Sequence, residues 1–271
     1  MKASAWSLSL ASAMQYAPFA TMQFTVITFM AMIVIGSRQH ALLILGHEGG
    51  HRLVASNQRL NDFLTNLFCF WPFGLDTREY RTFHLSHHRH VGTSDDPELE
   101  AKRDGGHAWD LPATRWRIAL LFVKDLVFGG LYEQVHLIRQ IPSLKRPWMF
   151  VTMIALWLIV GTVLFLFGVL WLLVLWFGSV CTTMWAMFRL RVWIEHQGTA
   201  GTHRVHASWL IRVFVAPHNT WYHYEHHCYP YIPCFNLPRI RVLLPEPPVQ
   251  TARELFEWYG GRPQTPSGTA C

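Results

Sequence analysis

The sequence predicts an all-α fold that is integral to a membrane. Only 15% of the 271 residues are charged and 51% are hydrophobic, whereas about a quarter of an average soluble protein is charged. The chain also contains uncharged runs that are long enough to cross a bilayer as helices. Its histidines gather in clusters with helical spacing. We therefore expect about three transmembrane helices, a re-entrant or interfacial segment, and a cytosolic helical cap that carries the histidine clusters.

The first predicted membrane helix covers residues 16–36, which contain no charge. At 1.5 Å per residue this run is about 30 Å long, which matches one hydrocarbon thickness. No proline or strong loop signal follows, so we expect the helix to continue out of the membrane and to carry His47 and His51 beyond the lipid. Gly49 and Gly50 weaken this extension by about 1 kcal/mol each relative to alanine. Close packing at this point is the expected reason for them.

Two shorter segments are not expected to cross. Residues 60–75 are apolar but brief, and Pro72 and Gly74 interrupt them, which favours a re-entrant or interfacial segment. Residues 118–138 mix apolar and charged positions. This pattern predicts one amphipathic helix, of the kind that lies on a membrane surface.

A helical hairpin is predicted over roughly 148–167 and 170–188. No Asp, Glu, Lys or Arg occurs from Trp148 to Phe188, which is about twice the length that one span needs. Gly168 lies near the middle and marks the turn. Basic residues flank both ends of the hairpin, and the positive-inside rule therefore places both ends on the cytoplasmic side. The flanking residues are Lys145, Arg146, Arg189 and Arg191.

We divide the chain into a membrane domain, residues 1–245, and a C-terminal tail, residues 246–271. The tail is rich in Pro, Gly and Thr, a composition that favours partial disorder. The net charge is +6. Because the basic residues cluster beside apolar runs, we attribute this charge to orientation in an anionic membrane, and we expect no nucleic-acid partner.

Three histidine clusters carry the chemistry. Two of them have the i, i+3, i+4 spacing, which lets three imidazoles on a helix point at one place. With residues 60–75 not crossing, all three clusters fall on one membrane face. Converging neutral imidazoles favour a bound metal such as zinc, copper, iron or nickel. The clusters are His47 and His51; His84, His87 and His88; and His223, His226 and His227.

In these residues the chain resembles the integral-membrane fatty acid desaturase and hydroxylase superfamily, which is defined by three histidine boxes on one membrane face. The resemblance covers roughly residues 30–240. It includes GSRQHALLILGHEGGH, YRTFHLSHHRHVGTSDDPE and the final HxxHH followed by Tyr229 and Pro230. It implies a non-haem diiron centre of two Fe ions, with a further histidine after the last span, which WIEHQG places at His196. The implied metal ligands and catalytic residues are His47, His51, His84, His87, His88, His196, His223, His226 and His227.

The resemblance also implies the activity. The expected enzyme is an O2-dependent oxidoreductase that introduces a double bond into a fatty acyl chain or another acyl or lipid substrate. An alternative that the residues leave open is a hydroxylase or ketolase that acts on a lipid, alkane or carotenoid with the same scaffold. Two functions outside this superfamily are also compatible with the residues: a membrane zinc protease, because HEGGH matches HExxH, and a metal transporter. Transporters place their ligands within the membrane, whereas the three predicted spans contain no histidine.

The electrons are expected from a separate protein. The sequence has no nucleotide fingerprint, no CxxCH haem site and no iron–sulfur cysteine spacing. A donor of ferredoxin or cytochrome type should therefore dock on the cytoplasmic face, close to the active site. The basic residues Arg78, Arg81 and Arg89 are candidates for attracting an acidic donor.

Several further polar residues are expected to have supporting roles. Carboxylates can orient an imidazole through the ring nitrogen that does not face the metal. His90 and His218 are expected at the edge of the site, and His203 and His206 in a polar loop. Asn219 is expected either to hold a water on an iron or to cap a helix. The candidate carboxylates are Glu48, Asp95, Asp96, Glu195 and Glu225.

Overall fold

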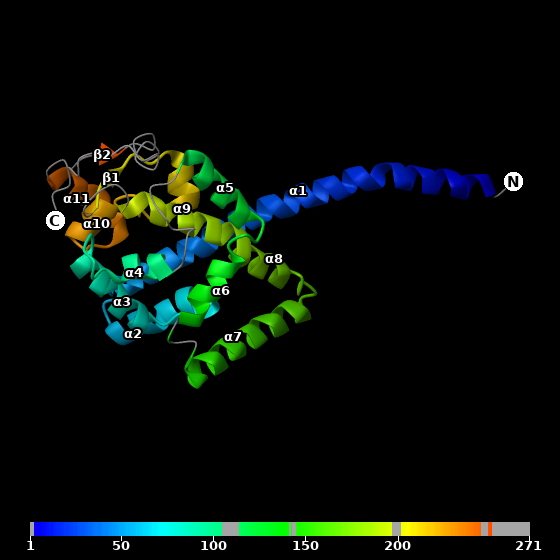
Figure 1. Ribbon diagram of the computed structural model, residues 1–271. Coiled ribbons are helices and arrows are strands. Elements are labelled where there is room, and N and C mark those ends of the chain that lie inside the picture. Colours follow the sequence, from blue (N-terminus) through cyan, green and yellow to red (C-terminus); the bar gives the residue numbers. More distant parts are fainter. Residues whose placement is uncertain are drawn as a thin grey trace.

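The helical fold predicted from the sequence is confirmed. Figure 1 shows helix α1 projecting from a body of shorter helices. Among the described residues, the strands β1 (Arg204–Val205) and β2 (Val249–Gln250) form one short parallel pair. Apart from β2, the tail predicted to be partly disordered lies outside the described residues. The computed structural model describes residues 3–104, 114–140, 142, 145–196, 202–244 and 249–250.

Helix α1 (Ala3–Gly50) is continuous through the predicted span and its extension. Its Thr25–Gly50 part is long and apolar enough to cross a membrane. The helix ends at Gly50, so His47 lies in its last turn and His51 directly follows it. The predicted extension of this helix toward the first histidine cluster is therefore confirmed.

Side chains from two later helices hold the C-terminal end of α1. Arg81 donates to the carbonyl oxygens of Gly50 at 2.8 Å and Gly49 at 3.0 Å, and Asn61 Nδ2 donates to Gly49 at 2.9 Å. These bonds satisfy carbonyls that a helix end leaves unpaired. Arg81 is itself buried and lies 2.6 Å from Asp62 Oδ1. The expectation that Arg81 attracts an electron donor at the surface is therefore wrong.

The segment after the first histidine cluster is short and broken, as predicted for residues 60–75. Helix α2 (Gln58–Thr65) runs into the π-helix η1 (Asn66–Phe70) and the 3-10 helix η2 (Trp71–Phe73). Gly74, with φ of 74°, turns the chain into α3 (Thr77–His90), which carries the second cluster. No candidate span falls on this segment in the part of the chain that the structure describes.

The prediction of one amphipathic helix over 118–138 is wrong. After α4 (Pro97–Asp104), the chain forms α5 (Arg115–Leu126) and α6 (Leu131–Gln140). Phe128 takes a φ of 66° between them, which interrupts a right-handed helix. A Cβ atom at Gly130 would lie 2.3 Å from Trp185 Cδ1, so close packing against the hairpin fixes the break.

The hairpin predicted from the uncharged run is present. Its first arm is α7 (Pro147–Leu166), and the chain turns at Gly168, where φ is 70°. The second arm continues to His196, beyond the predicted end at residue 188, and both arms are candidate spans. Figure 1 shows α7 and α8 joined at the turn. The second arm consists of α8 (Leu172–Ser179), the π-helix η5 (Val180–Met184) and α9 (Trp185–His196).

The arginines at the end of the hairpin are internal. Arg189 Nε lies 2.6 Å from Asp125 Oδ2, and the two side chains are 1% and 2% exposed. Arg191 Nε lies 2.6 Å from Glu195 Oε1. Neither arginine is therefore a surface charge beside the membrane, contrary to the prediction. Of the flanking cations, Lys145 and Arg146 are exposed.

The C-terminal cap packs on α1. The π-helix η6 (Ile211–Val215) leads to α10 (His223–Cys228), η7 (Cys234–Asn236) and α11 (Leu237–Leu243). His40 Nε2, on α1, lies 3.0 Å from the carbonyl oxygen of Val215. This contact joins the first helix to the segment that precedes the third histidine cluster.

Because the first and third spans approach closely at Gly36, the protein should be less stable with alanine at Gly36 than with alanine at Gly161. A Cβ at Gly36 would lie 2.0 Å from Thr183 Oγ1 and 2.6 Å from the backbone nitrogen of Met184, so Gly36→Ala should destabilise the protein by about 1–3 kcal/mol through overpacking. Gly161→Ala is the control, because the nearest atom would be Leu173 Cδ1 at 3.9 Å. Thermal unfolding in detergent measures both variants. Equal melting temperatures would contradict the packing argument.

Candidate metal site

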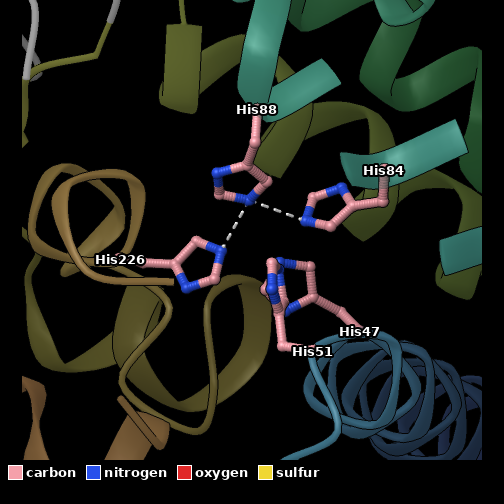
Figure 2. A group of neighbouring side chains, drawn as sticks. All are labelled: His47, His51, His84, His88 and His226. Carbon is pink, nitrogen blue, oxygen red and sulfur yellow. Dashed lines mark hydrogen bonds between the residues drawn. The ribbon is translucent and has the colours of Figure 1, made fainter. Parts of the chain in front are cut away.

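Eight of the nine histidines proposed from the sequence fall into two compact groups, and His223 adjoins the second group through His196. Within each group, one ring nitrogen of every residue lies within 4.8 Å of the others. The first group, drawn in Figure 2, combines residues from α1, α3 and α10. It consists of His47, His51, His84, His88 and His226.

Nitrogen–nitrogen distances in the first group suit a metal. His88 Nε2 lies 3.0 Å from His84 Nε2 and 3.1 Å from His226 Nε2. Ligands at right angles around a metal, each about 2.1 Å from it, have donor atoms about 3 Å apart. Figure 2 shows the rings of His47 and His51 turned toward the same space. Both histidines of the HEGGH motif therefore belong to a group of five histidines. The zinc-protease hypothesis gives no role to the other three histidines of this group.

The second group adjoins the first. His196 Nε2, at the end of α9, lies 3.2 Å from His87 Nε2 and 2.8 Å from His223 Nε2. His227 belongs with His87 and His196. The two groups are in contact, because the rings of His88 and His227 stack with their centroids 4.1 Å apart.

Each HxxHH box is divided between the groups, whereas the sequence suggested that its three imidazoles meet in one place. Successive residues of a helix are rotated by about 100°. His84 and His88 are thus only about 40° apart and share the first group, while His87 is turned to the second. In the third box only His226 joins the first group, whereas His227 belongs to the second group and His223 adjoins it.

Five of the rings are neutral and can donate electron pairs. Burial, and after it the charges of neighbouring histidines, keeps the pKa of His84, His226 and His227 well below the usual value. Burial and the charge of Arg81 lower the pKa of His51 to about 4. Burial and the charge of His51 lower the pKa of His88 to about 3. At neutral pH these imidazoles are therefore unprotonated, as metal ligation requires.

Unpaired ring nitrogens indicate that the site is built for something besides protein. Both ring nitrogens of His47 are buried without a hydrogen-bond partner among the described residues, as are Nε2 of His51 and Nε2 of His227. An unsatisfied buried polar group is costly. A metal ion would use these electron pairs, so the donor set fits one.

Carboxylates lie beside two of these imidazoles, and Asp96 is one of them. His87 Nδ1 donates to Asp96 Oδ1 at 2.8 Å, which leaves His87 Nε2 directed at the second group. Burial lowers the pKa of His87, but this bond and the charges of Glu98 and Asp96 outweigh burial and raise it. Glu195 Oε1 lies 3.5 Å from His223 Nδ1.

The remaining candidate carboxylates have different partners. Glu48 Oε2 accepts from the backbone nitrogen of Cys234 at 2.8 Å, which ties α1 to the cap. Glu225 is fully buried and paired with Arg204. Asp95 is exposed and accepts from Ser94 Oγ. None of these three carboxylates hydrogen-bonds to an imidazole among the described residues.

The remaining polar candidates lie at the edge of the site or away from it. His90 Nδ1 contacts Ser86 on its own helix, and His218 is exposed. Asn219 donates to the carbonyl oxygen of Cys234 at 3.1 Å, and α10 begins at His223 without a side-chain cap, so the capping role is wrong. His203 and His206 lie in loops on either side of β1, as expected, but His203 is fully buried whereas His206 is exposed.

Two residues of the site were missed in the sequence. Glu98 Oε2 lies 3.5 Å from His87 Nε2, and Lys102 holds its other oxygen at 2.8 Å. Tyr80 stacks on His84 with centroids 5.2 Å apart and an angle of 13°. Tyr80 precedes His84 by four residues, so its helical spacing was a usable signal. Glu98 lies on a different helix from His87, and no local spacing marks it.

Asp96 and Asp95 offer a matched test of imidazole orientation. Asp96→Asn keeps the cap that Asp96 Oδ1 provides to the Glu98 nitrogen at 2.9 Å, because asparagine also caps helices, but it removes the charge that holds the His87 Nδ1 proton. We expect metal affinity to fall by about 10- to 100-fold, measured by competition with a chelator. Asp95→Asn should leave the affinity unchanged. Equal affinities of the two variants would exclude the orienting role.

Two known proteins are similar to this chain. A beta-carotene ketolase from Paracoccus sp. (strain N81106 / MBIC 01143) is 26% identical over 208 residues, which cover 74% of this chain and 73% of the ketolase. A dihydrorhizobitoxine desaturase from Bradyrhizobium elkanii is 30% identical over 103 residues, 37% of this chain and 29% of that protein. No solved structure matches significantly.

The family of the chain follows from a match that spans the site. The model of the fatty acid desaturase family matches residues 23–256. This range contains all three candidate membrane spans and both histidine groups. The chain is therefore an integral membrane protein that belongs to the fatty acid desaturase family.

Proposed function

We propose that the protein is a non-haem diiron, O2-dependent oxidoreductase that introduces a double bond into an apolar acyl-type or other lipid substrate. The observation that carries this proposal is the convergence of eight histidines into two adjoining groups, with His223 beside the second, at the end of the membrane spans. Two groups suit two metal ions better than one. Zinc does not change its valence, so redox chemistry at such a site calls for another metal.

The ligand assignment follows the two groups. His47, His51, His84, His88 and His226 would hold one ion, and His87, His196 and His227 would hold the other, together with the adjoining His223, whose Nε2 lies 2.8 Å from His196 Nε2. When bound, a pair of irons supplies the electrons that activate O2 and the oxidising power to remove hydrogen from an unactivated C–H bond. Burial keeps five of these imidazoles neutral, and Asp96 holds the proton on His87 Nδ1.

A ketolase or hydroxylase is the second candidate. The similarity to the carotene ketolase covers 74% of this chain, whereas the similarity to the desaturase covers 37%. Both reactions begin with removal of hydrogen from carbon. They differ in whether a second hydrogen is removed or oxygen is transferred to the carbon, and the histidines alone do not select between these outcomes.

Product analysis distinguishes the two candidates. The enzyme, expressed in membranes with a redox partner, would be supplied with isotope-labelled acyl lipids and labelled carotenoids under 18O2. A desaturase product is lighter by two hydrogens and contains no label from O2, whereas a hydroxylase product gains one 18O atom and a ketolase product gains one oxygen and loses two hydrogens. If neither product appears with iron-loaded protein and active redox partners, the proposal is wrong.

We also propose that the site faces the cytoplasm and receives electrons from a ferredoxin- or cytochrome-type donor. The exposed cations Lys145 and Arg146, which precede the second span, support this orientation through the positive-inside rule. The exposed Arg78 and Arg89 remain candidates for contact with an acidic donor. Labelling of an introduced cysteine at Asp95 in intact cells tests the orientation, because only an external site reacts with a membrane-impermeant thiol reagent.

A further inference from the structure

A cavity of about 500 Å³ is lined by residues of α2, α3 and the start of α7, and no histidine is among its lining residues. Its wall includes Arg59 on α2, Arg78 on α3 and Arg146 at the start of α7. Helix α7 contacts η2, which brings these elements together. In Figure 1 the first end of α7 lies on the same side of the molecule as α2.

The cavity lies where the chain enters the membrane. Arg146 caps α7, a candidate span that begins at Pro147. Trp148, which also lines the cavity, is 47% exposed, and Phe63 is 52% exposed. Tryptophan gathers at the boundary between lipid and water. The mouth of the cavity is therefore at the level of lipid headgroups.

The charges that line the cavity are balanced. Three arginines face three carboxylates, those of Asp62, Asp76 and Glu79. Asp62 is paired with Arg81, and Glu79 Oε1 lies 2.9 Å from Arg146 Nη2. A site of this kind complements a zwitterion better than an anion.

Two exposed arginines can bind an anionic group. The side chain of Arg78 is 82% exposed, and its closest carboxylate is Asp62 at 3.8 Å. Arg59 is exposed and makes no ion pair within the described part of the chain. Guanidinium groups form paired hydrogen bonds with phosphate oxygens.

The cavity wall also keeps unused polar atoms. Trp71 Nε1 and Glu79 Oε2 are buried without a hydrogen-bond partner among the described residues, whereas Glu79 Oε1 is paired with Arg146. The indole is a donor and the carboxylate is an acceptor. A donor that suits phosphate and an acceptor that suits ammonium therefore line the same cavity.

We propose that this cavity binds the headgroup of a zwitterionic phospholipid of the phosphatidylethanolamine type. Its phosphate lies between Arg59 and Arg78, and its ammonium group lies beside Glu79. The acyl chains extend along the exposed apolar side chains of α7, among them Phe150 and Val151. The binding is independent of the histidine site.

Native mass spectrometry of the full-length, delipidated protein in detergent tests the proposal. Short-chain phosphatidylethanolamine, phosphatidylglycerol and diacylglycerol are titrated separately. Wild type should bind one phosphatidylethanolamine more tightly than either of the two competing lipids. The double variant Arg59→Gln/Arg78→Gln should lose about tenfold or more in affinity, because charge-assisted hydrogen bonds are lost. Arg89→Gln, an exposed arginine of α3 outside the cavity, should bind as wild type does.

Three results would overturn the proposal. The first is equal affinity for all three lipids, which indicates coating of the apolar spans. The second is unchanged binding by the double variant. The third is displacement of the lipid by inorganic phosphate at equal concentration, which indicates a site for free phosphate. Because Arg59, Arg78 and Arg89 are exposed, the double variant and the Arg89→Gln control should both melt at the wild-type temperature in the absence of lipid. The single variant Arg59→Gln provides a further check on folding.

Discussion

Replacing His226 with alanine should abolish product formation and remove metal from the first histidine group. His226 is the residue that α10 contributes to this group, and its Nε2 lies 3.1 Å from His88 Nε2. Loss of residues that merely orient a ligand typically costs about 10- to 100-fold in affinity or activity, so loss of a ligand should cost more than about 100-fold. Iron per chain and product per hour are the two measurements.

His218→Ala is the matched control for this variant. His218 lies eight residues earlier in the same cap, but its side chain is exposed and belongs to neither group. Its replacement should leave iron content and activity unchanged. If His226→Ala retained full iron content and activity, His226 would not be a ligand. If His218→Ala also lost iron, the loss would reflect the stability of the cap.

Replacing Arg189 with methionine should destabilise the protein by about 3–5 kcal/mol. The change leaves Asp125, which is 2% exposed, without its counter-charge. It also removes the guanidinium that lies 5.6 Å from the Trp185 ring and 3.5 Å from Glu133. The contact between α5 and α9 therefore depends on this arginine. The fraction that remains folded after heating in detergent measures the effect.

The double variant Asp125→Leu/Arg189→Met distinguishes charge from packing. Replacement of a whole buried ion pair by apolar residues is often neutral or stabilising, so the double variant should recover most of the lost stability. Replacement of the exposed Arg78 by methionine should change stability by less than about 1 kcal/mol. A single Arg189→Met variant as stable as wild type would show that the pair does not hold α5 on α9.

Local signals in the sequence were sufficient for the spans and the histidine boxes. The uncharged run after Trp148 and the turn at Gly168 determine the hairpin, because span length and a left-handed glycine are properties of the chain itself. The i, i+4 spacing of His84 and His88 likewise predicted that their rings meet.

Contacts between distant segments were not predictable in this way. Arg189 and Asp125 are 64 residues apart, and Arg81 and Asp62 are 19 apart. A charged residue beside an apolar run has the same local pattern whether it flanks a membrane or pairs inside the protein. The two arginines were therefore assigned to the surface, although both are buried.

The division of the histidine boxes had a different cause. The rotation of about 100° between neighbouring residues places His87 and His88 in different directions on any helix. Which group each ring joins depends on how α3 is rotated against α1 and α10, and this rotation is a property of the packed structure. The sequence therefore indicated which histidines come together, but it did not indicate how they divide between the two groups.

The shared boxes couple the occupancy of the two proposed metal positions. His87 and His88 are adjacent on α3, and His226 and His227 are adjacent on α10, yet each pair serves both groups. An ion in the first group would fix both helices. A second ion would then bind to helices that are already ordered, so its binding would cost less conformational entropy. On the proposed assignment we expect cooperative loading, in which chains with two ions or none outnumber chains with a single ion.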